Sequence, residues 1–265
     1  MGKLEELILK HSWRGMDILR RYLPEDFCYE AAQAVLSWKR GTILLTTGFY
    51  VNGHAETDGP PGTLLLIEAL QKLGFVPVVV TDEICKGYFE ENGIETVYFP
   101  IGAEDADCRD CLTRLDPVGL IAIERCGKNT LGFYENSGGD TMESVTAPVD
   151  RLFELATVPT IGIGDGGNEI GMGKLASVIE ASLSLKPCRV TADHLIVATV
   201  SNWGAIALAG ALGYLPSESA FLHAYQQAQR FGYVDGFTGD STLTEDKFSL
   251  DVGLQLLREL REICE

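Results

Sequence analysis

The chain has 265 residues, of which 46% are hydrophobic and 22% charged, so its composition and length fit one globular domain. Its formal net charge of -17 disfavours nucleic acid as a partner, because no basic stripe is present to neutralise phosphates. No stretch approaches the roughly 20 apolar residues of a membrane helix, and MGKLEELILK lacks a signal-peptide core, so we expect a cytoplasmic protein without a membrane partner.

The same composition limits the chemistry of a site. Because an acidic chain repels small anions at long range, a site for an anionic substrate needs a local positive source, such as an arginine, a helix N-terminus or a bound cation. The seven cysteines are an odd number, and only Cys108 and Cys111 form a CxxC pair. We therefore expect free thiols and no zinc ribbon.

Helical periodicity dominates residues 1–40, which we expect to form a helical segment without recognisable chemistry at the start of a single domain, 1–265. After Gly41, short aliphatic runs alternate with amphipathic stretches, as in successive βαβ units. We predict an α/β fold: a three-layer α/β/α sandwich with a mostly parallel, doubly wound, Rossmann-like sheet. Strands are expected at 42–46, 76–81, 95–99, 120–123, 160–163 and 195–198, and helices at 63–73, 84–92, 106–114, 149–156, 175–184, 203–212, 219–230 and 250–263.

The loop after the first expected strand contains two carboxylates. Ligands of such sheets bind beyond the carboxyl ends of the strands, where this loop begins. It holds Glu56 and Asp58 and runs through GPPG into a helix. Asp58 either caps that helix or projects into the crevice with Glu56, while the free N–H groups at the helix start receive a carboxylate. The sequence leaves both alternatives open.

Glu124 and Arg125 come directly after the fourth expected strand. A charged pair at the end of a buried strand is either a structural ion pair or part of a pocket. Since cations are scarce in this chain, Arg125 is the side-chain candidate for holding a carboxylate through its planar guanidinium. The glycines and Asn136 farther along indicate a loop that folds over the crevice.

The fifth expected strand leads into TIGIGDGGNEIGMGK, where Gly162, Gly164 and Gly167 match the dinucleotide pattern G-x-G-x-x-G. Asp165 and Glu169 would bring negative charge to a pyrophosphate in this turn. Oxygen ligands clustered on a tight turn fit a divalent cation, Mg or Mn, or a substrate ammonium. We therefore expect no nucleotide cofactor, and Asp165 and Glu169 are the candidate metal ligands.

Two later segments are compatible with either a structural or a binding role. Ser201, Asn202 and Trp203 begin a helix of small residues, either as a helix cap with a core tryptophan or as part of a pocket. Thr238 lies among glycines in VDGFTG, which forms either a simple turn or a pocket rim.

These segments resemble a known family, the C-terminal catalytic-type domain of D-glutamate cyclases. The resemblance rests on TTGF, ETDGPPG, IERCG, TAPVDRLF, TIGIGDGGNEIGMG, SNWGA and VDGFTG, which lie between about Gly41 and Gly239. It implies a carbon–oxygen lyase that converts D-glutamate into 5-oxo-D-proline with loss of water. The expected partner is then a small acidic amino acid, and a homo-oligomer stays open.

The chemistry that the resemblance implies assigns roles to the candidate residues. The amine must be neutral to attack, and the γ-carboxylate must become electrophilic. We expect Asp58 to be the base or the ammonium anchor, and Arg125 to hold the α-carboxylate together with the helix start. Asp165 and Glu169 are then expected to hold a divalent cation that polarises the γ-carboxyl, while Asn168 orients the departing oxygen.

Two rival interpretations are a nucleotide- or phosphate-dependent enzyme that uses the loop 162–167 and a non-catalytic amino-acid-binding protein. For the cyclase, the catalytic candidates are Asp58, Glu56, Arg125 and Glu124, and the substrate-binding candidates are Thr47, Gly48, Thr57, Gly59, Gly62, Asn136, Asn168, Asn202 and Thr238.

Overall fold

A computed structural model describes residues 2–265 and has a six-stranded parallel sheet at its centre. The strand order is β5-β4-β1-β6-β7-β8. The strands are β1 (Thr42–Thr46), β4 (Val76–Thr81), β5 (Glu95–Tyr98), β6 (Gly119–Ile123), β7 (Thr160–Gly164) and β8 (His194–Val197). Each agrees with its predicted range to within one residue at either end.

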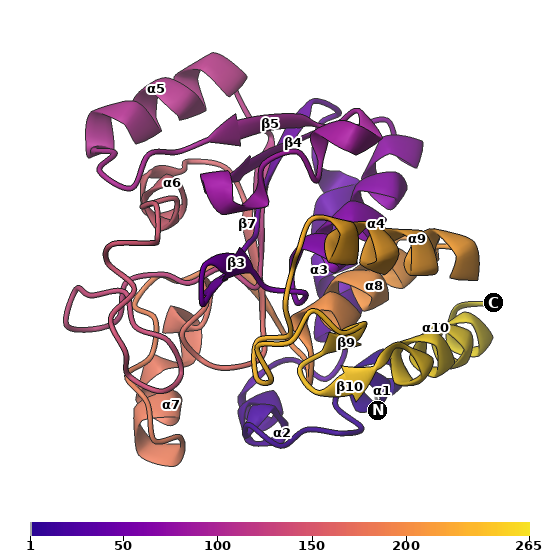
Figure 1. The fold of residues 1–265 in the computed structure, drawn as a ribbon. Coiled ribbons are helices and arrows are strands. Elements are labelled where there is room, and N and C mark those ends of the chain that lie inside the picture. Colours follow the sequence, from indigo (N-terminus) through magenta and orange to yellow (C-terminus); the bar gives the residue numbers. More distant parts are fainter. Residues whose placement is uncertain (1) are drawn as a thin grey trace.

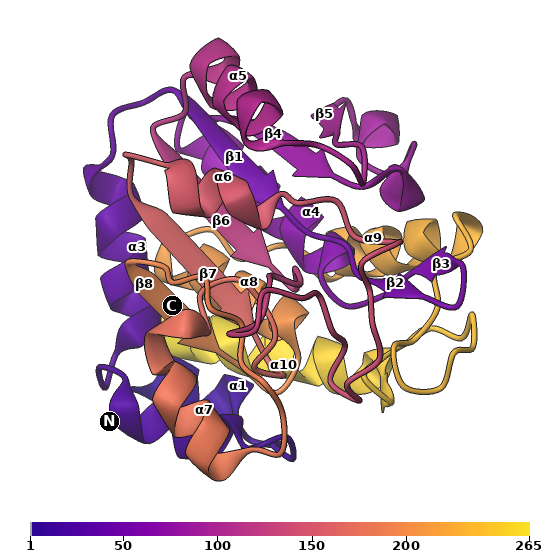
Figure 2. The same cartoon turned by 90° about the vertical axis from the view of Figure 1, so that its left-hand side faces the viewer.

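Helices cover both faces of the sheet (Figure 1). On one side lie α5 (Asp105–Leu115), α6 (Asp150–Leu155) and α7 (Ala176–Ser182), which Figure 2 shows nearest the viewer. On the other side lie α3 (Phe27–Ser37), α4 (Pro60–Lys72), α8 (Ser201–Ala211), α9 (Glu218–Arg230) and α10 (Leu250–Cys264). The predicted three-layer sandwich is confirmed.

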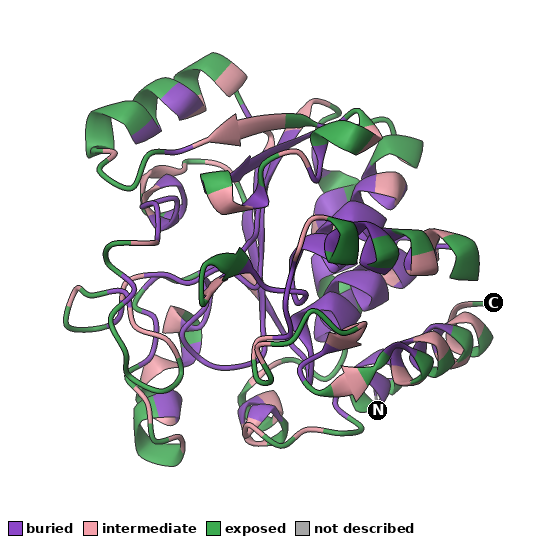
Figure 3. Ribbon diagram, in the orientation of Figure 1, coloured by how far each residue is buried: buried purple, intermediate pink, exposed green. Residues whose placement is uncertain are grey.

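Helix α8 shows why small residues were needed in this layer. Its residues from Ser201 to Gly210 are all buried, and Figure 3 shows α8 and the sheet together as the buried centre of the molecule. A Cβ at Gly204 would lie 2.7 Å from Ile163 Cγ2, so a glycine is what allows the helix to lie this close to β7. The run of alanine and glycine therefore sets the helix-to-sheet distance.

The order of the strands fixes where a ligand site can form. From β1 the chain adds β4 and β5 on one side and then returns to place β6 on the other side of β1. This is the doubly wound order, with its switch point between β1 and β6. The loops after these two strands diverge there and leave a crevice beyond their carboxyl ends.

Short elements of the chain differ from the prediction. The helix expected at 84–92 is two 3₁₀ helices, η2 (Glu83–Cys85) and η3 (Glu90–Asn92). Gly87 separates them with φ of 90°, a left-handed conformation that ends a helix. Two unpredicted hairpins also occur, β2 (Tyr50–Val51) with β3 (His54–Ala55), and β9 (Thr244–Glu245) with β10 (Phe248–Ser249).

The N-terminal segment contains α1 (Lys3–Ile8), α2 (Met16–Leu19) and the 3₁₀ helix η1 (Arg20–Tyr22). Helix α1 packs against α8 and α10. All seven cysteines are free, as expected. Across residues 2–265, every helix is too short or too polar to traverse a lipid bilayer.

Candidate functional site

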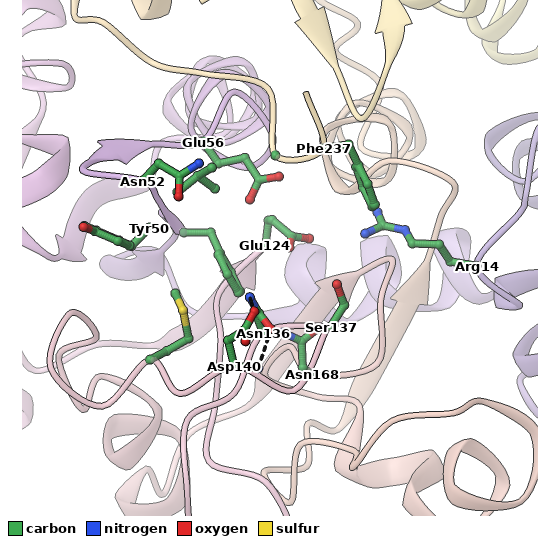
Figure 4. Close-up of a pocket in the computed structure, with 14 residues that line it drawn as sticks. Arg14, Tyr50, Asn52, Glu56, Glu124, Asn136, Ser137, Asp140, Asn168 and Phe237 are labelled. Atoms are coloured by element: carbon green, nitrogen blue, oxygen red, sulfur yellow. Dashed lines mark hydrogen bonds between the residues drawn. The ribbon is translucent and has the colours of Figure 1, made fainter. Parts of the chain in front are cut away.

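A pocket of about 380 Å³ opens at the switch point between β1 and β6 (Figure 4). Several separate stretches of the chain contribute to its wall, including the N-terminal segment and the loop before β9. The lining residues are Arg14, Phe49, Tyr50, Val51, Asn52, Glu56, Glu124, Asn136, Ser137, Asp140, Met142, Asn168, Gly236 and Phe237. The structure thus brings together four sequence candidates, Glu56, Glu124, Asn136 and Asn168.

Glu124 stands at the end of β6 in a conformation that non-glycine residues rarely adopt. Its φ is 45°, in the left-handed region. Its backbone N–H donates to the carbonyl oxygen of Ile163, at 3.1 Å, and Ser201 Oγ donates to its Oε2 at 2.5 Å. Such strain persists where the surrounding structure fixes it, and here it turns the carboxylate into the pocket.

Glu56 faces Glu124 across the pocket, and Figure 4 shows both side chains directed into the same space. The Glu56 carboxylate packs directly over Gly236: a Cβ at Gly236 would lie 1.6 Å from Glu56 Oε1. Position 236 therefore has to be glycine for Glu56 to hold this place.

Beneath the pocket lies a cluster of buried carboxylates. Carboxylate oxygens of Asp58, Asp165 and Asp246 lie within 4.8 Å of one another, and so do those of Glu124, Asp165 and Glu169. Asp165 belongs to both sets, is fully buried, and its Oδ1 accepts no hydrogen bond. The turn between β9 and β10 supplies Asp246, with φ of 48°.

Arg14 is the cation of this site. Its guanidinium forms ion pairs with Asp165 and Asp246 and lies over the ring of Phe237, 5.0 Å from the ring centre. Residues 1–40 were expected to carry no recognisable chemistry, and that expectation was wrong for Arg14. No motif marks either Arg14 or Asp246, since both reach the site only through the tertiary fold.

One guanidinium cannot compensate all of these carboxyl groups. Burial is the main reason that the pKa values of Glu56, Asp58, Glu124 and Asp165 are raised well above their usual range, and neighbouring carboxylates raise them further. Arg14 acts in the opposite direction on Glu56, Glu124 and Asp165. Two carboxylates 4 Å apart repel by about 4 kcal/mol at an effective dielectric constant near 20, so the group needs protons or a further cation.

The glycine-rich turn after β7 binds its own carboxylate. The N–H groups of Gly166 and Gly167 donate to the two oxygens of Glu169, each at 2.7 Å. A dinucleotide fingerprint would offer N–H groups of this kind to a pyrophosphate. A Cβ at Gly162 would lie 2.4 Å from the carbonyl oxygen of Ile170, so this glycine serves backbone packing. The turn is thus built around an internal anion.

Asp58 and Asn202 cap each other's helices. Asp58, which precedes α4, accepts hydrogen bonds from the N–H groups of Ser201 and Asn202 at the start of α8. Asn202 Oδ1 accepts from the N–H groups of Gly59 and Gly62 at the start of α4. These N–H groups are therefore not free for a substrate carboxylate, and Asp58 is a helix cap, although of α8 and not of the helix that follows it.

Arg125 does not line the pocket. Its guanidinium donates to both carboxylate oxygens of Asp82, at 2.5 and 2.8 Å, and to the carbonyl oxygens of Gly48 and Ala147, each at 2.8 Å. The two neighbours therefore differ: Arg125 forms a structural ion pair, with Asp82 and not with Glu124, whereas Glu124 is part of the pocket. Arg125 joins three loops beneath the pocket wall, and Arg14 occupies the place expected for it.

The remaining candidates support the pocket from outside its lining. Thr57 Oγ1 donates to the carbonyl oxygen of Thr244, and a Cβ at Gly59, where φ is 100°, would lie 2.5 Å from Thr47 Oγ1. Thr238 is exposed and donates its N–H to Asp235, whereas its neighbours Gly236 and Phe237 line the pocket. The substrate-binding candidates that the structure leaves outside the lining are Thr47, Gly48, Thr57, Gly59, Gly62, Asn202 and Thr238.

Comparison with known proteins identifies the family of this chain. A family model described as D-glutamate cyclase-like, C-terminal, matches residues 4–261. The chain belongs to this D-glutamate cyclase-like family. Human mitochondrial D-glutamate cyclase is 32% identical over 245 residues, which are 81% of this chain and 39% of that protein. The chain therefore spans about two fifths of the length of this relative.

The motifs that carried the family resemblance supply much of the site. ETDGPPG contributes Glu56 and Asp58, and GIGDGGNEIGMG contributes Asp165, Asn168 and Glu169. In this member of the D-glutamate cyclase-like family, these motif residues thus lie in the pocket lining or in the cluster of buried carboxylates beneath it.

Proposed function

We propose that this chain is a D-glutamate cyclase-like hydro-lyase that forms 5-oxo-D-proline from D-glutamate. The observation that carries the proposal is a small pocket in which one guanidinium and two opposed carboxylates, those of Arg14, Glu56 and Glu124, face a common space. An amino acid with two carboxylates and one ammonium complements these charges. Family membership and the named activity of the human relative support the same reaction.

In the proposed complex, Arg14 binds a carboxylate of the substrate. It is the arginine in the pocket lining, and its planar donors fit a carboxylate. The ammonium group then lies toward Glu56 and Glu124. Holding both ends of the substrate keeps its chain curled, which lowers the entropy cost of ring closure.

Glu56 is the proposed general base. Asp58 was expected to be the base or the ammonium anchor, but its oxygens accept hydrogen bonds from the N–H groups of Gly59, Ser201 and Asn202. Glu56 lines the pocket, and its raised pKa brings its basicity closer to that of the group it must deprotonate. The neutral amine attacks the γ-carbon and a C–N bond forms. One C–O bond of the γ-carboxylate then breaks, and its oxygen leaves as water with two protons: the one that Glu56 took from the ammonium and the one that the nitrogen loses as it becomes an amide.

A divalent cation, Mg²⁺ or Mn²⁺, is proposed at Glu124, Asp165 and Glu169. These are hard oxygen ligands close enough to share one ion, and the unpartnered Asp165 Oδ1 fits such a role. When bound, the ion supplies Lewis acidity for the γ-carboxyl group and compensates the buried negative charge. Asn168 lines the pocket and is the proposed residue for orienting the departing oxygen.

The test is turnover of both enantiomers. Purified protein is incubated with D-glutamate or L-glutamate, with and without Mn²⁺, and 5-oxoproline is followed by proton NMR. Conversion of D-glutamate above the background rate supports the proposal. If glutamate binds in a calorimetric titration but is not converted under any condition, the protein is an amino-acid binder and the proposal is wrong.

A further inference from the structure

Arg14 forms an ion pair with Asp165, the carboxylate that belongs to both sets of buried carboxylates. Asp165 belongs to the set with Asp58 and Asp246 and also to the set with Glu124 and Glu169. The ion pair between Arg14 and Asp165 therefore lies where the proposed divalent cation would also bind.

Arg14 does not pair with every buried oxygen of Asp165. Asp165 Oδ1 is fully buried and accepts no hydrogen bond, although Asp165 Oδ2 is paired with the guanidinium. Arg14 Nε is likewise buried without an acceptor. A buried oxygen without a partner is costly, so a second ligand at Asp165 is favourable.

We infer that Arg14 is an exchangeable counterion: its guanidinium neutralises Asp165 in the free protein, and a divalent cation at Asp165 displaces it toward the pocket, where it binds the carboxylate of the substrate. This inference rests on the proposed function. It makes Arg14 a positioning residue for the metal and a contact of the substrate, in that order.

The surroundings of Arg14 allow such a movement. The residue lies between α1 and α2, outside any helix, and its side chain is 15% exposed on the pocket side. Its guanidinium lies over the rings of Trp13 and Phe237, and both rings are partly exposed. Phe237 also lines the pocket, so the guanidinium can shift along an aromatic surface without losing its cation–π contact.

Charge repulsion disfavours a state in which Arg14 and a divalent cation both bind Asp165. A divalent cation and a guanidinium on the same carboxylate repel each other, so each weakens the binding of the other. By the same linkage, a carboxylate ligand that holds Arg14 in the pocket strengthens the binding of the metal.

The first test measures Mn²⁺ affinity through the free-ion signal in electron paramagnetic resonance. R14Q removes the competing charge and is expected to lower the Mn²⁺ dissociation constant at least tenfold. K247Q is the matched control, because Lys247 also lies over Trp13 and Phe237 but forms no ion pair with Asp165 in the described structure. Its effect should stay below threefold. Equal or weaker Mn²⁺ binding by R14Q overturns the inference.

The deciding arm of the second test uses the wild-type protein, so it does not depend on whether the variant folds. Glutarate has two carboxylates but no amine, so it cannot cyclise. Saturating glutarate should lower the Mn²⁺ dissociation constant at least threefold in the wild type, and it should have no effect in R14Q. No coupling in the wild type overturns the inference. If no Mn²⁺ binds at all, the inference falls with the proposed metal, whereas cyclase activity without metal would leave the proposed function standing.

Discussion

At the scale of single residues, the position of Glu56 depends on the absence of a side chain at Gly236. The space that a Cβ would need is already occupied by the Glu56 carboxylate. Gly236 does not have a left-handed φ, so an alanine there is compatible with the backbone. The carboxylate, at the end of a flexible side chain, is the part that must move.

Gly236→Ala should therefore lower kcat without unfolding the protein. A displacement of about 1 Å in a catalytic group can cost on the order of 100-fold in rate, and we expect at least a tenfold loss. The free energy of unfolding should change by less than about 1 kcal/mol, because only a side-chain end shifts. Steady-state kinetics and urea unfolding measure the two effects. Unchanged kcat would show that Glu56 need not hold this position.

The pH dependence of turnover tests the role of Glu56 as base. Its pKa is raised, mainly by burial and then by Asp246 and Glu124, and a base acts only when it is deprotonated. The rate kcat/KM should rise with pH through this raised pKa, and not through the ordinary glutamate range. Glu56→Gln should remove this limb of the profile and lower kcat by about 100-fold or more. A variant that keeps the wild-type profile contradicts the assignment.

Single residues also show where sequence reasoning ends. Glu56 and Glu124 could be predicted, because each follows a strand at the edge where ligands bind. Arg14 could not, since it belongs to the N-terminal segment, and only the packing of α1 and the following loop brings it to the pocket. Arg125 was favoured in its place because nothing in the sequence shows that Asp82 holds it.

At the scale of secondary-structure elements, α4 and α8 are joined at their N-termini. Asp58 accepts from the start of α8, and Asn202 accepts from the start of α4. The Pro-Pro start of α4 removes two further N–H donors. These contacts hold the loop 47–59, which carries Glu56, against the helix that follows β8.

Asn202→Ala should destabilise the protein more than loss of an ordinary helix cap. It removes the acceptor for two buried N–H groups, and we expect a loss of about 2 to 3 kcal/mol. Ser217→Ala is the matched control, because Ser217 caps only α9 and is exposed; its loss should cost about 1 kcal/mol. Urea unfolding compares the two variants. Equal losses in the free energy of unfolding would argue against a joint role of Asn202 at the N-termini of α4 and α8.

Strands were the most predictable elements of this fold. Continuous aliphatic runs such as 76–81 are explained by burial on both sheet faces, which leaves little choice of structure. The segment 84–92 was predicted less well, since its apolar residues Tyr88 and Phe89 are buried as expected of a helix while Gly87 interrupts the backbone. The two short hairpins have strands of two residues, too short for any periodic signal.

At the scale of the whole molecule, the site collects acidic groups from segments far apart in the sequence. Glu245, beside Asp246 in the last hairpin, is fully buried and accepts hydrogen bonds from Trp203 Nε1 and Asn202 Nδ2. Burial raises its pKa to about 7, although these hydrogen bonds act to lower it. Some of the carboxyl groups counted in the formal net charge of -17 are thus buried inside the protein.

Stability should fall as pH rises because of Glu245. In the folded state its proton is retained to about pH 7, whereas in the unfolded chain it is lost near the ordinary value of about 4.3, so the contribution is full below that value and is lost as pH rises through 7. Between pH 4.5 and 8 the wild type should lose about 3 kcal/mol relative to Glu245→Gln. Urea unfolding across this range gives the difference, and a difference that does not vary with pH would contradict the expectation.

The assembly of the pocket also explains what the sequence could reveal of the function. The family motifs supply carboxylates from the loops after β1 and β7, so an acidic site for a small molecule could be predicted. Its cation and the last of its carboxylates, Arg14 and Asp246, come from the two ends of the chain. No local pattern reports that those ends meet.

We propose that this pocket catalyses ring closure of D-glutamate with Glu56 as base. The most direct measurement is chiral chromatography of 5-oxoproline formed from D-glutamate by the wild type and by Glu56→Gln at equal concentrations. We predict 5-oxo-D-proline from the wild type and at least 100-fold less from the variant. Equal rates for the two folded proteins, or no product from the wild type, would contradict the claim.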